Sequence, residues 1–307
     1  MKEKRLARVR IPAEVRGRVC AAREQGGTIG FVPTMGALHE GHLSLVRMAC
    51  ERTSFLVASI FVNPKQFGPR EDYGRYPRDE VGDAALLEEN GCDLLFAPTE
   101  RDLYSSDDRT RISVTGLDEF LCGSSRPGHF NGVSLVVAKL FNIVQPDEAY
   151  FGQKDAQQAV IIQRMTADLD FPVRIVVGPT VREDDGLAMS SRNRYLEPEE
   201  RGRAVALYEA LMDARRLLEE GERAPEAVKR IMVSRLKRSE LEIDYAEVVD
   251  AATLRPVGGI EGHVLIAVAA RLGGTRLIDN IVLRIAGERV EEARLEFPEW
   301  SRYGWKA

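Results

Sequence analysis

Two of the four histidines of this 307-residue chain lie three positions apart, in the stretch FVPTMGALHEGHLSLVR. His39 and His42 fall between an apolar run, TIGFVP, and a segment with helical periodicity, LSLVRMAC. At positions i and i+3 near the start of a helix, the two imidazoles share one face. A helix start also offers free N–H groups and a partial positive charge, which attract phosphate. The pair therefore favours an anion site.

Two other interpretations of the pair stay open from local features. Zinc would need a third ligand, and the spacing here is HxxH rather than HExxH. The imidazoles could also be structural. Gly41 lies between them, where any side chain would crowd a bound base or phosphate. Neither GxxxxGK[ST] nor a GxGxxG after the first predicted strand occurs, so the common phosphate-binding fingerprints are absent.

Two later clusters also suit a phosphorylated ligand. In GQKDAQQ, Lys154 can serve phosphate and Asp155 a ribose hydroxyl, or Asp155 can simply cap a helix. AMSSRNR combines hydroxyls with guanidiniums, which suit the charge on transferring phosphoryl oxygens. An ordinary surface loop or a serine nucleophile is the alternative there, although GxSxG is missing.

Two further clusters suit a small organic substrate. NPKQFG sets the amides of Asn63 and Gln66 beside an aromatic ring, and RPGHFNG places an arginine and a histidine before an apolar helix. Each is a weak signal alone.

Alternating elements must position these clusters. Apolar runs predict buried strands at 28–33, 54–63, 92–98, 148–152 and 173–179. Helices are predicted at 13–25, 38–50, 79–90, 132–145 and 155–169. This alternation predicts an α/β fold with a doubly wound, Rossmann-like parallel sheet. Ligands of such sheets bind beyond the carboxyl ends of the strands, and the clusters follow strand ends, so one shared site is expected.

The pattern changes after about residue 185. Helices are predicted at 197–222 and 224–239, and strands at 243–250, 263–272 and 276–285. Helices followed by an apparently antiparallel sheet indicate a smaller α+β domain. The predicted divisions are a Rossmann-like domain at 1–183, the α+β domain at 184–286 and a loosely attached extension at 287–307.

Composition narrows the class of protein. Hydrophobic residues make up 44% and charged residues 30%, a soluble globular balance. The net charge of −5 argues against a nucleic-acid partner. The sequence contains no run of 18 apolar residues, so no membrane span is predicted. A charged N-terminal stretch without an apolar core predicts no secretory signal. The four cysteines form no CxxC, so reduced thiols and a cytoplasmic location are expected.

Six motifs occur in this chain in the order in which one enzyme family has them. They are PTMGALHEGHLSLVR, SIFVNPKQFG, YPRD, RPGHFNGV, FGQKDAQQ and PTVREDDGLAMSSRNRYL. Over residues 5–285 the chain resembles the pantoate–β-alanine ligases (pantothenate synthetases), which are HxGH nucleotidyltransferases related to class I aminoacyl-tRNA synthetases. The resemblance implies an ATP-dependent condensation of pantoate with β-alanine. The products would be pantothenate, AMP and diphosphate, formed through pantoyl adenylate on the route to coenzyme A.

The resemblance also implies roles for individual residues. The catalytic set would be His39, His42, Lys154, Ser190 and Arg192. ATP would contact Met35, His42, Gly152, Lys154, Asp155, Val181, Met189, Ser190, Ser191 and Arg192. Pantoate would contact Met35, Asn63, Gln66 and Gln158, with Tyr76 and Arg126 at the border of the site. Mg²⁺ would bridge the phosphates, with Asp83 as a protein contact.

The resemblance further implies a homodimer, formed through the first domain, and a second domain that closes over the nucleotide as a lid. One rival is another HxGH nucleotidyltransferase, making a dinucleotide or a CDP-alcohol, which would not need the amides of NPKQFG. Another rival is a non-catalytic nucleotide-binding regulator. The joint presence of His39, His42, Lys154, Ser190 and Arg192 disfavours the regulator, because binding alone would not require them all.

Overall fold

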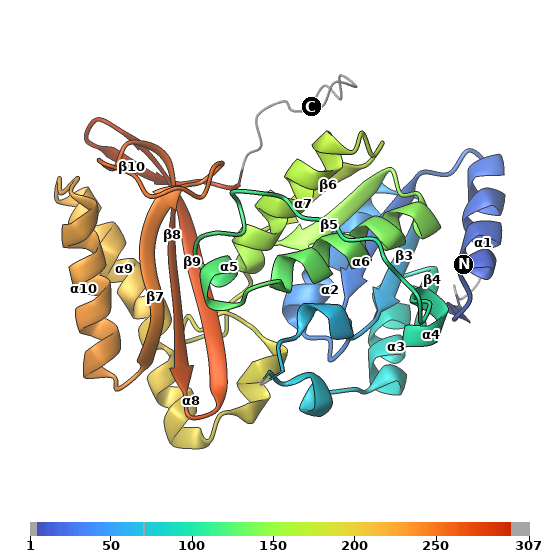
Figure 1. Cartoon of the computed structure of the whole chain (residues 1–307), viewed down its shortest axis with the longest axis horizontal. Coiled ribbons are helices and arrows are strands. Elements are labelled where there is room, and N and C mark those ends of the chain that lie inside the picture. The colour runs from blue at the N-terminus through green and yellow to red at the C-terminus, as the bar shows by residue number, and fades with distance from the viewer. Residues whose placement is uncertain (1–4, 70, 296–307) are drawn as a thin grey trace.

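The computed structural model describes residues 5–69 and 71–295. Figure 1 shows two layered units side by side, the first built on a parallel sheet and the second on an antiparallel sheet. No helix within the described ranges is long and apolar enough to cross a membrane. The predicted fold class, a doubly wound sheet followed by a smaller α+β unit, is confirmed.

Parallel pairing sets the order of the first sheet. Its strands are β1 (Ala7–Val9), β2 (Ile29–Thr34), β3 (Phe55–Ile60), β4 (Leu94–Phe96), β5 (Glu148–Gly152) and β6 (Arg174–Gly178). They lie in the order β1-β4-β3-β2-β5-β6. The chain builds outward from β2 to β4 and then returns to the other side of β2 with β5. The neighbours β2 and β5 are therefore the topological switch point, where such sheets bind ligands.

Helices cover both faces of this sheet. Those of the first unit are α1 (Pro12–Glu24), α2 (Glu40–Arg52), α3 (Glu80–Glu89), α6 (His129–Val144) and α7 (Ala156–Asp168). The helices α1, α6 and α7 pack on one face, and α2 and α3 on the other. Phe31 joins the first of these cores and Val32 the second, and both are fully buried. Burial on both faces explains why β2 is a continuous apolar run.

Short elements fill the connections. The predicted loop at 64–77 contains two 3-10 turns, η1 (Pro64–Gln66) and η2 (Tyr73–Arg75). The remaining short helices are α4 (Glu100–Leu103) and α5 (Cys122–Ser125). The edge strand β1 was not predicted, because three residues are too few for a period to be recognised.

The second unit packs helices on one face of its sheet, as Figure 1 shows. Its strands are β7 (Glu242–Asp250), β8 (Gly262–Leu272), β9 (Thr275–Ala286) and β10 (Arg289–Glu292), and its helices are α8 (Pro198–Ala204), α9 (Ala206–Glu219) and α10 (Pro225–Arg238). The single helix predicted at 197–222 is wrong, because α8 and α9 are separated at Val205. Val205 keeps right-handed helical torsions, so the side-chain pattern carries no sign of the break.

The expected loose extension at 287–307 also needs correction. Residues 289–292 form β10, which pairs antiparallel with β9 across a turn at Gly287. Leu295 is buried against both units. Backbone hydrogen bonds hold β10, and only Val290 packs on the second core, so its polar composition suggested a free tail. Residues 296–307 lie outside the described residues. The boundary between 183 and 184 stays a prediction.

Helix α6 approaches the backbone of η1 at Gly132. A Cβ added there would lie 2.1 Å from the carbonyl oxygen of Lys65 and 2.7 Å from the amide nitrogen of Gln66. We predict that Gly132→Ala lowers the free energy of unfolding by about 1–3 kcal/mol, because the helix and η1 must separate. Urea denaturation measures the change.

Gly17→Ala is the matched control for this substitution. Gly17 also lies in a helix, and a Cβ added there meets nothing within 4 Å. It should stabilise the protein slightly, by about 0.5–1 kcal/mol, through helix propensity. Equal effects of the two substitutions would contradict the close approach.

Candidate active site

The start of α2 is capped by the two histidines themselves. His39 is the N-cap residue, and its Nδ1 accepts the N–H of Gly41 at 3.2 Å. The Nδ1 of His42 accepts the N–H of His39 in turn, at 3.4 Å. The ring centroids lie 4.1 Å apart. A Cβ at Gly41 would lie 3.0 Å from the ring of His39, so the glycine makes room first for this imidazole.

Burial determines the charge of both rings. It lowers the pKa of His39 to about 3 and that of His42 to about 4, and the ammonium of Lys154 contributes to both shifts. Both imidazoles are therefore neutral near pH 7. Because each Nδ1 accepts a backbone N–H, each proton must sit on Nε2. The pair offers a ligand two neutral N–H donors rather than two positive charges.

Asp83 supports the turn that leads into α2. Gly36 and Ala37 both adopt positive φ, at 81° and 50°. The carboxylate of Asp83 accepts the N–H groups of Ala37 and Leu38 at 2.8 and 2.7 Å. A Cβ at Gly36 would lie 2.9 Å from that carboxylate, so only glycine fits. Asp83 is buried, and both of its oxygens are engaged, so this arrangement makes it a support for the turn rather than a magnesium contact.

A cavity of about 200 Å³ opens beyond the carboxyl ends of β2, β5 and β6, at the switch point. The expected site residues on its wall are Met35, His39, His42, Gln66, Tyr76, Arg126, Gly152, Lys154, Asp155, Gln158, Val181, Met189, Ser190, Ser191 and Arg192. The five clusters, which are distant in sequence, thus converge. In the part of the chain that the structure describes, no group of three or more His, Cys, Asp and Glu residues could hold a metal ion.

The amide pair of the NPKQFG motif is arranged in two layers. Gln66 lies at the cavity wall, with its Nε2 3.2 Å from the sulfur of Met35. Asn63 lies behind it, 1% exposed, and donates to Gln66 Oε1 and to the carbonyl of Gly132, each at 3.0 Å. Its Oδ1 accepts the hydroxyl of Tyr104 at 2.9 Å. Asn63 lines no part of the cavity in this structure, and its hydrogen bond positions Gln66.

Arg126 and His129 hold the same loop from the other side. Glu71 forms a bidentate ion pair with Arg126, accepting from Nε at 2.7 Å and from Nη2 at 2.6 Å. Arg126 lies 2.9 Å from His129 Nε2, and the Nδ1–H of His129 donates to the carbonyl of Gln66 at 2.7 Å. Burial lowers the pKa of His129 to about 4, so it is neutral and acts as a hydrogen-bonding link. The backbone of Gln66 is thereby fixed as well as its side chain.

The loop of the AMSSRNR motif is tied to the first unit. Ser190 caps the 3-10 helix η4 (Ser191–Tyr195), and Ser191 donates to the carbonyl of Ala37 at 3.1 Å. Arg192 forms a bidentate pair with Asp72, through Nε at 2.8 Å and Nη2 at 3.0 Å. This pair leaves the Nη1 edge of the guanidinium for other contacts.

The 3-10 turn η3 (Gln153–Asp155) carries the expected phosphate and ribose contacts. Asp155 is exposed and makes no side-chain cap bond to α7, so its carboxylate is available to a ligand. Lys154 Nζ lies 3.9 Å from that carboxylate. Asn280, on β9, donates to the carbonyls of Gln153 and Lys154 at 3.0 and 2.9 Å. The second unit thus holds the turn that presents Lys154.

Sequence reasoning missed these supporting residues. Glu71 and Asp72 lie in the connection at 64–77, and their arginine partners are 55 and 120 positions away. Asn280 lies within a predicted strand, where nothing distinguishes it from an ordinary polar strand residue. No local signal could have identified these three.

A doubly wound parallel sheet with donors and cations gathered at its switch point defines a Rossmann-like nucleotide-binding enzyme. Residues 8–282 match the family model described as pantoate-beta-alanine ligase. The chain belongs to that family, and it is a ligase that forms pantothenate.

Several known proteins are similar over nearly the whole chain. A pantothenate synthetase of Moorella thermoacetica is 54% identical, covering 89% of this chain and 97% of that protein. The crystal structure of pantothenate synthetase from Thermus thermophilus is 48% identical, with a TM-score of 0.85 over 89% of this chain and 98% of that one. The pantoate-beta-alanine ligase of Francisella tularensis, complexed with beta-gamma ATP and beta-alanine, is 33% identical, with a TM-score of 0.75 over 90% and 97%.

The buried neutral histidines predict a pH-dependent stability. The pKa of His42 falls from 6.5 to about 4 on folding, so the unfolded chain binds more protons between these values. The free energy of unfolding should therefore fall as pH is lowered from 6.5 towards 4. His42→Gln keeps an acceptor for the helix cap and removes one titrating group. In this variant the free energy of unfolding should change less steeply with pH, by up to one proton or about 1.4 kcal/mol per pH unit.

Urea denaturation at pH 4.5, 5.5 and 6.5 gives both slopes. The carboxylates that also titrate in this range are common to both proteins, so the difference reports on His42 and on its contribution to the lowered pKa of His39. Identical slopes would show that His42 is as easily protonated in the folded protein as in the unfolded chain.

Proposed function

We propose that this chain condenses pantoate with β-alanine at the expense of ATP through a pantoyl-adenylate intermediate, releasing AMP and diphosphate. The product would enter coenzyme A biosynthesis. The observation that carries the proposal is the convergence of His39 and His42 Nε2–H donors with Lys154, Ser190 and Arg192 on one cavity. The proposal agrees with the beta-gamma ATP and beta-alanine named for the Francisella tularensis relative.

The first step needs alignment and charge stabilisation rather than an enzyme nucleophile. A carboxylate oxygen of pantoate attacks the α-phosphorus of ATP, and the bond to the β,γ-diphosphate breaks. Gln66 and Gln158 are proposed to hold pantoate, beside Met35. Preorganised donors aimed at the growing charge on the phosphoryl oxygens lower the barrier, and the two Nε2–H groups are such donors. Their neutrality avoids tight binding of the ground-state phosphates by full charges.

The remaining nucleotide contacts are assigned by position on the cavity wall. Gly152 and Asp155 are proposed at the ribose, with Val181 and Met189 beside the nucleotide. Lys154, Ser190, Ser191 and Arg192 are proposed at the phosphates. Arg192 can reach them with its Nη1 edge while Asp72 holds Nε and Nη2.

In the second step the neutral amine of β-alanine attacks the acyl carbon of the adenylate. The bond to AMP breaks, and the amine nitrogen loses a proton as the amide forms. An acyl adenylate hydrolyses in water, so the site must be closed while it exists. We propose that the second unit acts as a lid, moving with the loop at 188–194. The bonds from Asn280 to the turn of Lys154 support such a coupling.

Magnesium is proposed to accompany ATP. The donor set does not form a dedicated protein site, since both Asp83 oxygens accept backbone N–H groups and no metal-binding cluster occurs among the described residues. Mg²⁺ commonly keeps its waters and binds substrate phosphates. The ion would therefore be held by the nucleotide. A homodimer and a cytoplasmic location remain part of the proposal.

An isotope experiment tests the intermediate. With pantoate labelled by ¹⁸O in its carboxylate, ATP and β-alanine, we expect one labelled oxygen to appear in AMP. That transfer follows because the carboxylate oxygen bonded to phosphorus leaves with AMP in the second step. Mass spectrometry of the products measures it. Label in inorganic phosphate with ADP would indicate an acyl phosphate instead, and AMP formed only with another acid would overturn the substrate.

The role of the imidazole pair has its own test. We predict that His42→Ala slows formation of the adenylate by at least about 10²-fold, because one donor to the transition state is lost. Rapid-quench measurement of diphosphate release in a single turnover with ATP and pantoate, without β-alanine, gives the rate of this step. His263→Ala is the matched control, since His263 is the second residue of β8 and does not line the cavity. Near-wild-type turnover of His42→Ala would exclude the role.

A further inference from the structure

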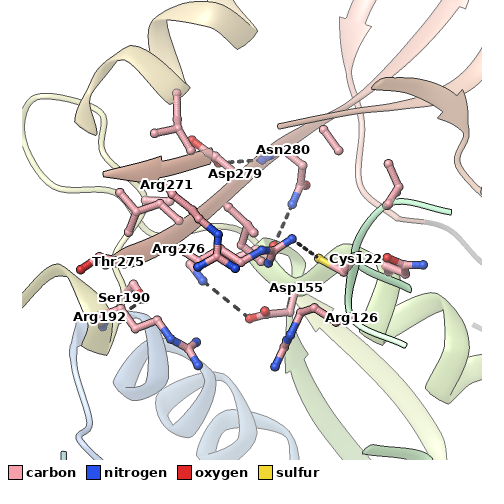
Figure 2. Close-up of a pocket in the computed structure, with 18 of the residues that line it drawn as sticks. Cys122, Arg126, Asp155, Ser190, Arg192, Arg271, Thr275, Arg276, Asp279 and Asn280 are labelled. Atoms are coloured by element: carbon pink, nitrogen blue, oxygen red, sulfur yellow. Dashed lines mark hydrogen bonds and ion pairs between the residues drawn. The ribbon is translucent and has the colours of Figure 1, made fainter. Parts of the chain in front are cut away.

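A second cavity, of about 120 Å³, lies between the two units. It shares Lys154, Asp155, Ser190 and Arg192 with the first cavity, together with Arg126, His129 and Gln158. The two cavities therefore meet along a wall that includes the residues assigned to the phosphates. Its outer wall comes from the end of β8 and the start of β9. Figure 2 shows Arg271, Arg276, Arg192 and Arg126 gathered around one space, with the carboxylate of Asp155 between them.

The guanidiniums of this cavity differ in how far they are neutralised. Arg126, Arg192 and Arg276 each have a carboxylate partner, namely Glu71, Asp72 and Asp244. Arg75 donates to the carbonyl of Gly274 at 3.1 Å. Across residues 5–69 and 71–295, no carboxylate lies within ion-pair distance of Arg271. Arg271 therefore brings an uncompensated charge to the cavity.

Arg271 is exposed and has another arginine beside it in the sheet. Arg271 lies directly opposite Arg276 in the β8–β9 pair, and like charges in such positions destabilise a sheet. Asp244 forms an ion pair with Arg276 and accepts its Nε–H at 2.8 Å. Glu242, opposite Arg271 on β7, is exposed and forms no ion pair with it among the described side chains. An anion bound between the two arginines would relieve this repulsion.

We propose that the second cavity binds inorganic diphosphate, the leaving group of the first step, before it departs. The inference rests on the proposed function for the origin of this anion. Diphosphate forms at the shared wall of Lys154 and Arg192, and the cationic lining continues from there to Arg271 and Arg276. Guanidiniums suit the many oxygens of diphosphate, because they donate in bidentate fashion. β-Alanine can then occupy the first cavity without meeting the leaving group.

Two other anions could use the same chemistry. The triphosphate of ATP could extend into the cavity, and the carboxylate of β-alanine could bind there. Each predicts a different kinetic signature, because only diphosphate acts as a product inhibitor through this site. Arg271 suits the test since it lies outside the wall shared with the first cavity.

The experiment measures inhibition by diphosphate in wild type and Arg271→Gln, with magnesium held constant. We expect the inhibition constant to rise about three- to fivefold, because one charge-assisted contact is lost at an exposed arginine. The KM values for ATP and β-alanine should stay within about twofold. Arg284→Gln is the matched control, because Arg284 is an exposed arginine of β9 that lines neither cavity. It should leave all three constants unchanged.

Calorimetric titration of the full-length protein with diphosphate, without other substrates, gives an independent readout. Arg271→Gln should weaken this binding by a similar factor, and sulfate should bind the wild type far more weakly. If turnover with pantoate is absent but the Arg271-dependent binding persists, the proposed function fails and the diphosphate site stands.

Several results would overturn the diphosphate site. If the KM for ATP rises together with the inhibition constant, the cavity holds the triphosphate of ATP. If only the KM for β-alanine rises, the cavity holds the carboxylate of β-alanine. Equal binding of sulfate and diphosphate would indicate a nonspecific anion site. An unchanged inhibition constant in Arg271→Gln would remove the basis of the proposal.

Discussion

The first N–H groups of α2 have no partners within the helix, and the way they are satisfied governs the site. Most helices use a serine, threonine or acidic side chain for this purpose. Here imidazole Nδ1 atoms accept the N–H groups of Gly41 and His39. That choice selects one tautomer and leaves both Nε2–H groups for a ligand, while burial keeps both rings neutral. Structural capping and substrate contact are thus two functions of the same pair of rings.

The cations around the cavity are held by acids and amides from distant parts of the chain. Glu71 and Asp72, neighbours in one loop, hold Arg126 and Arg192. The second unit holds the turn of Lys154 through Asn280. These side chains cost conformational entropy to order, and fixed partners reduce what a ligand must order on binding. Preorganisation of this kind explains why so many polar residues near the cavity bond to other groups of the protein.

Much of the framework follows from local pattern. The apolar run of β2 and the helical periodicity after His42 predicted both elements within a few residues of their observed bounds. The convergence of the motif residues was predicted because parallel strands bring their carboxyl ends to one edge. The errors arose where pattern carries no information. The break at Val205 keeps right-handed helical torsions, and β10 is a polar strand held by its backbone.

The sequence alone determined which side chains can serve phosphate and which strand ends carry them, because periodicity and motif spacing are local properties. Only the tertiary structure decided which of those side chains face the cavity and which stand behind it. Asn63 and Asp83 have the residue types of ligand contacts, yet folding uses their polar atoms for Gln66 and for the turn before α2. The cationic space between the units likewise arises from strands far along the chain. A hydrogen bond is decided by distance and direction in space, and sequence order does not encode either for residues a hundred positions apart.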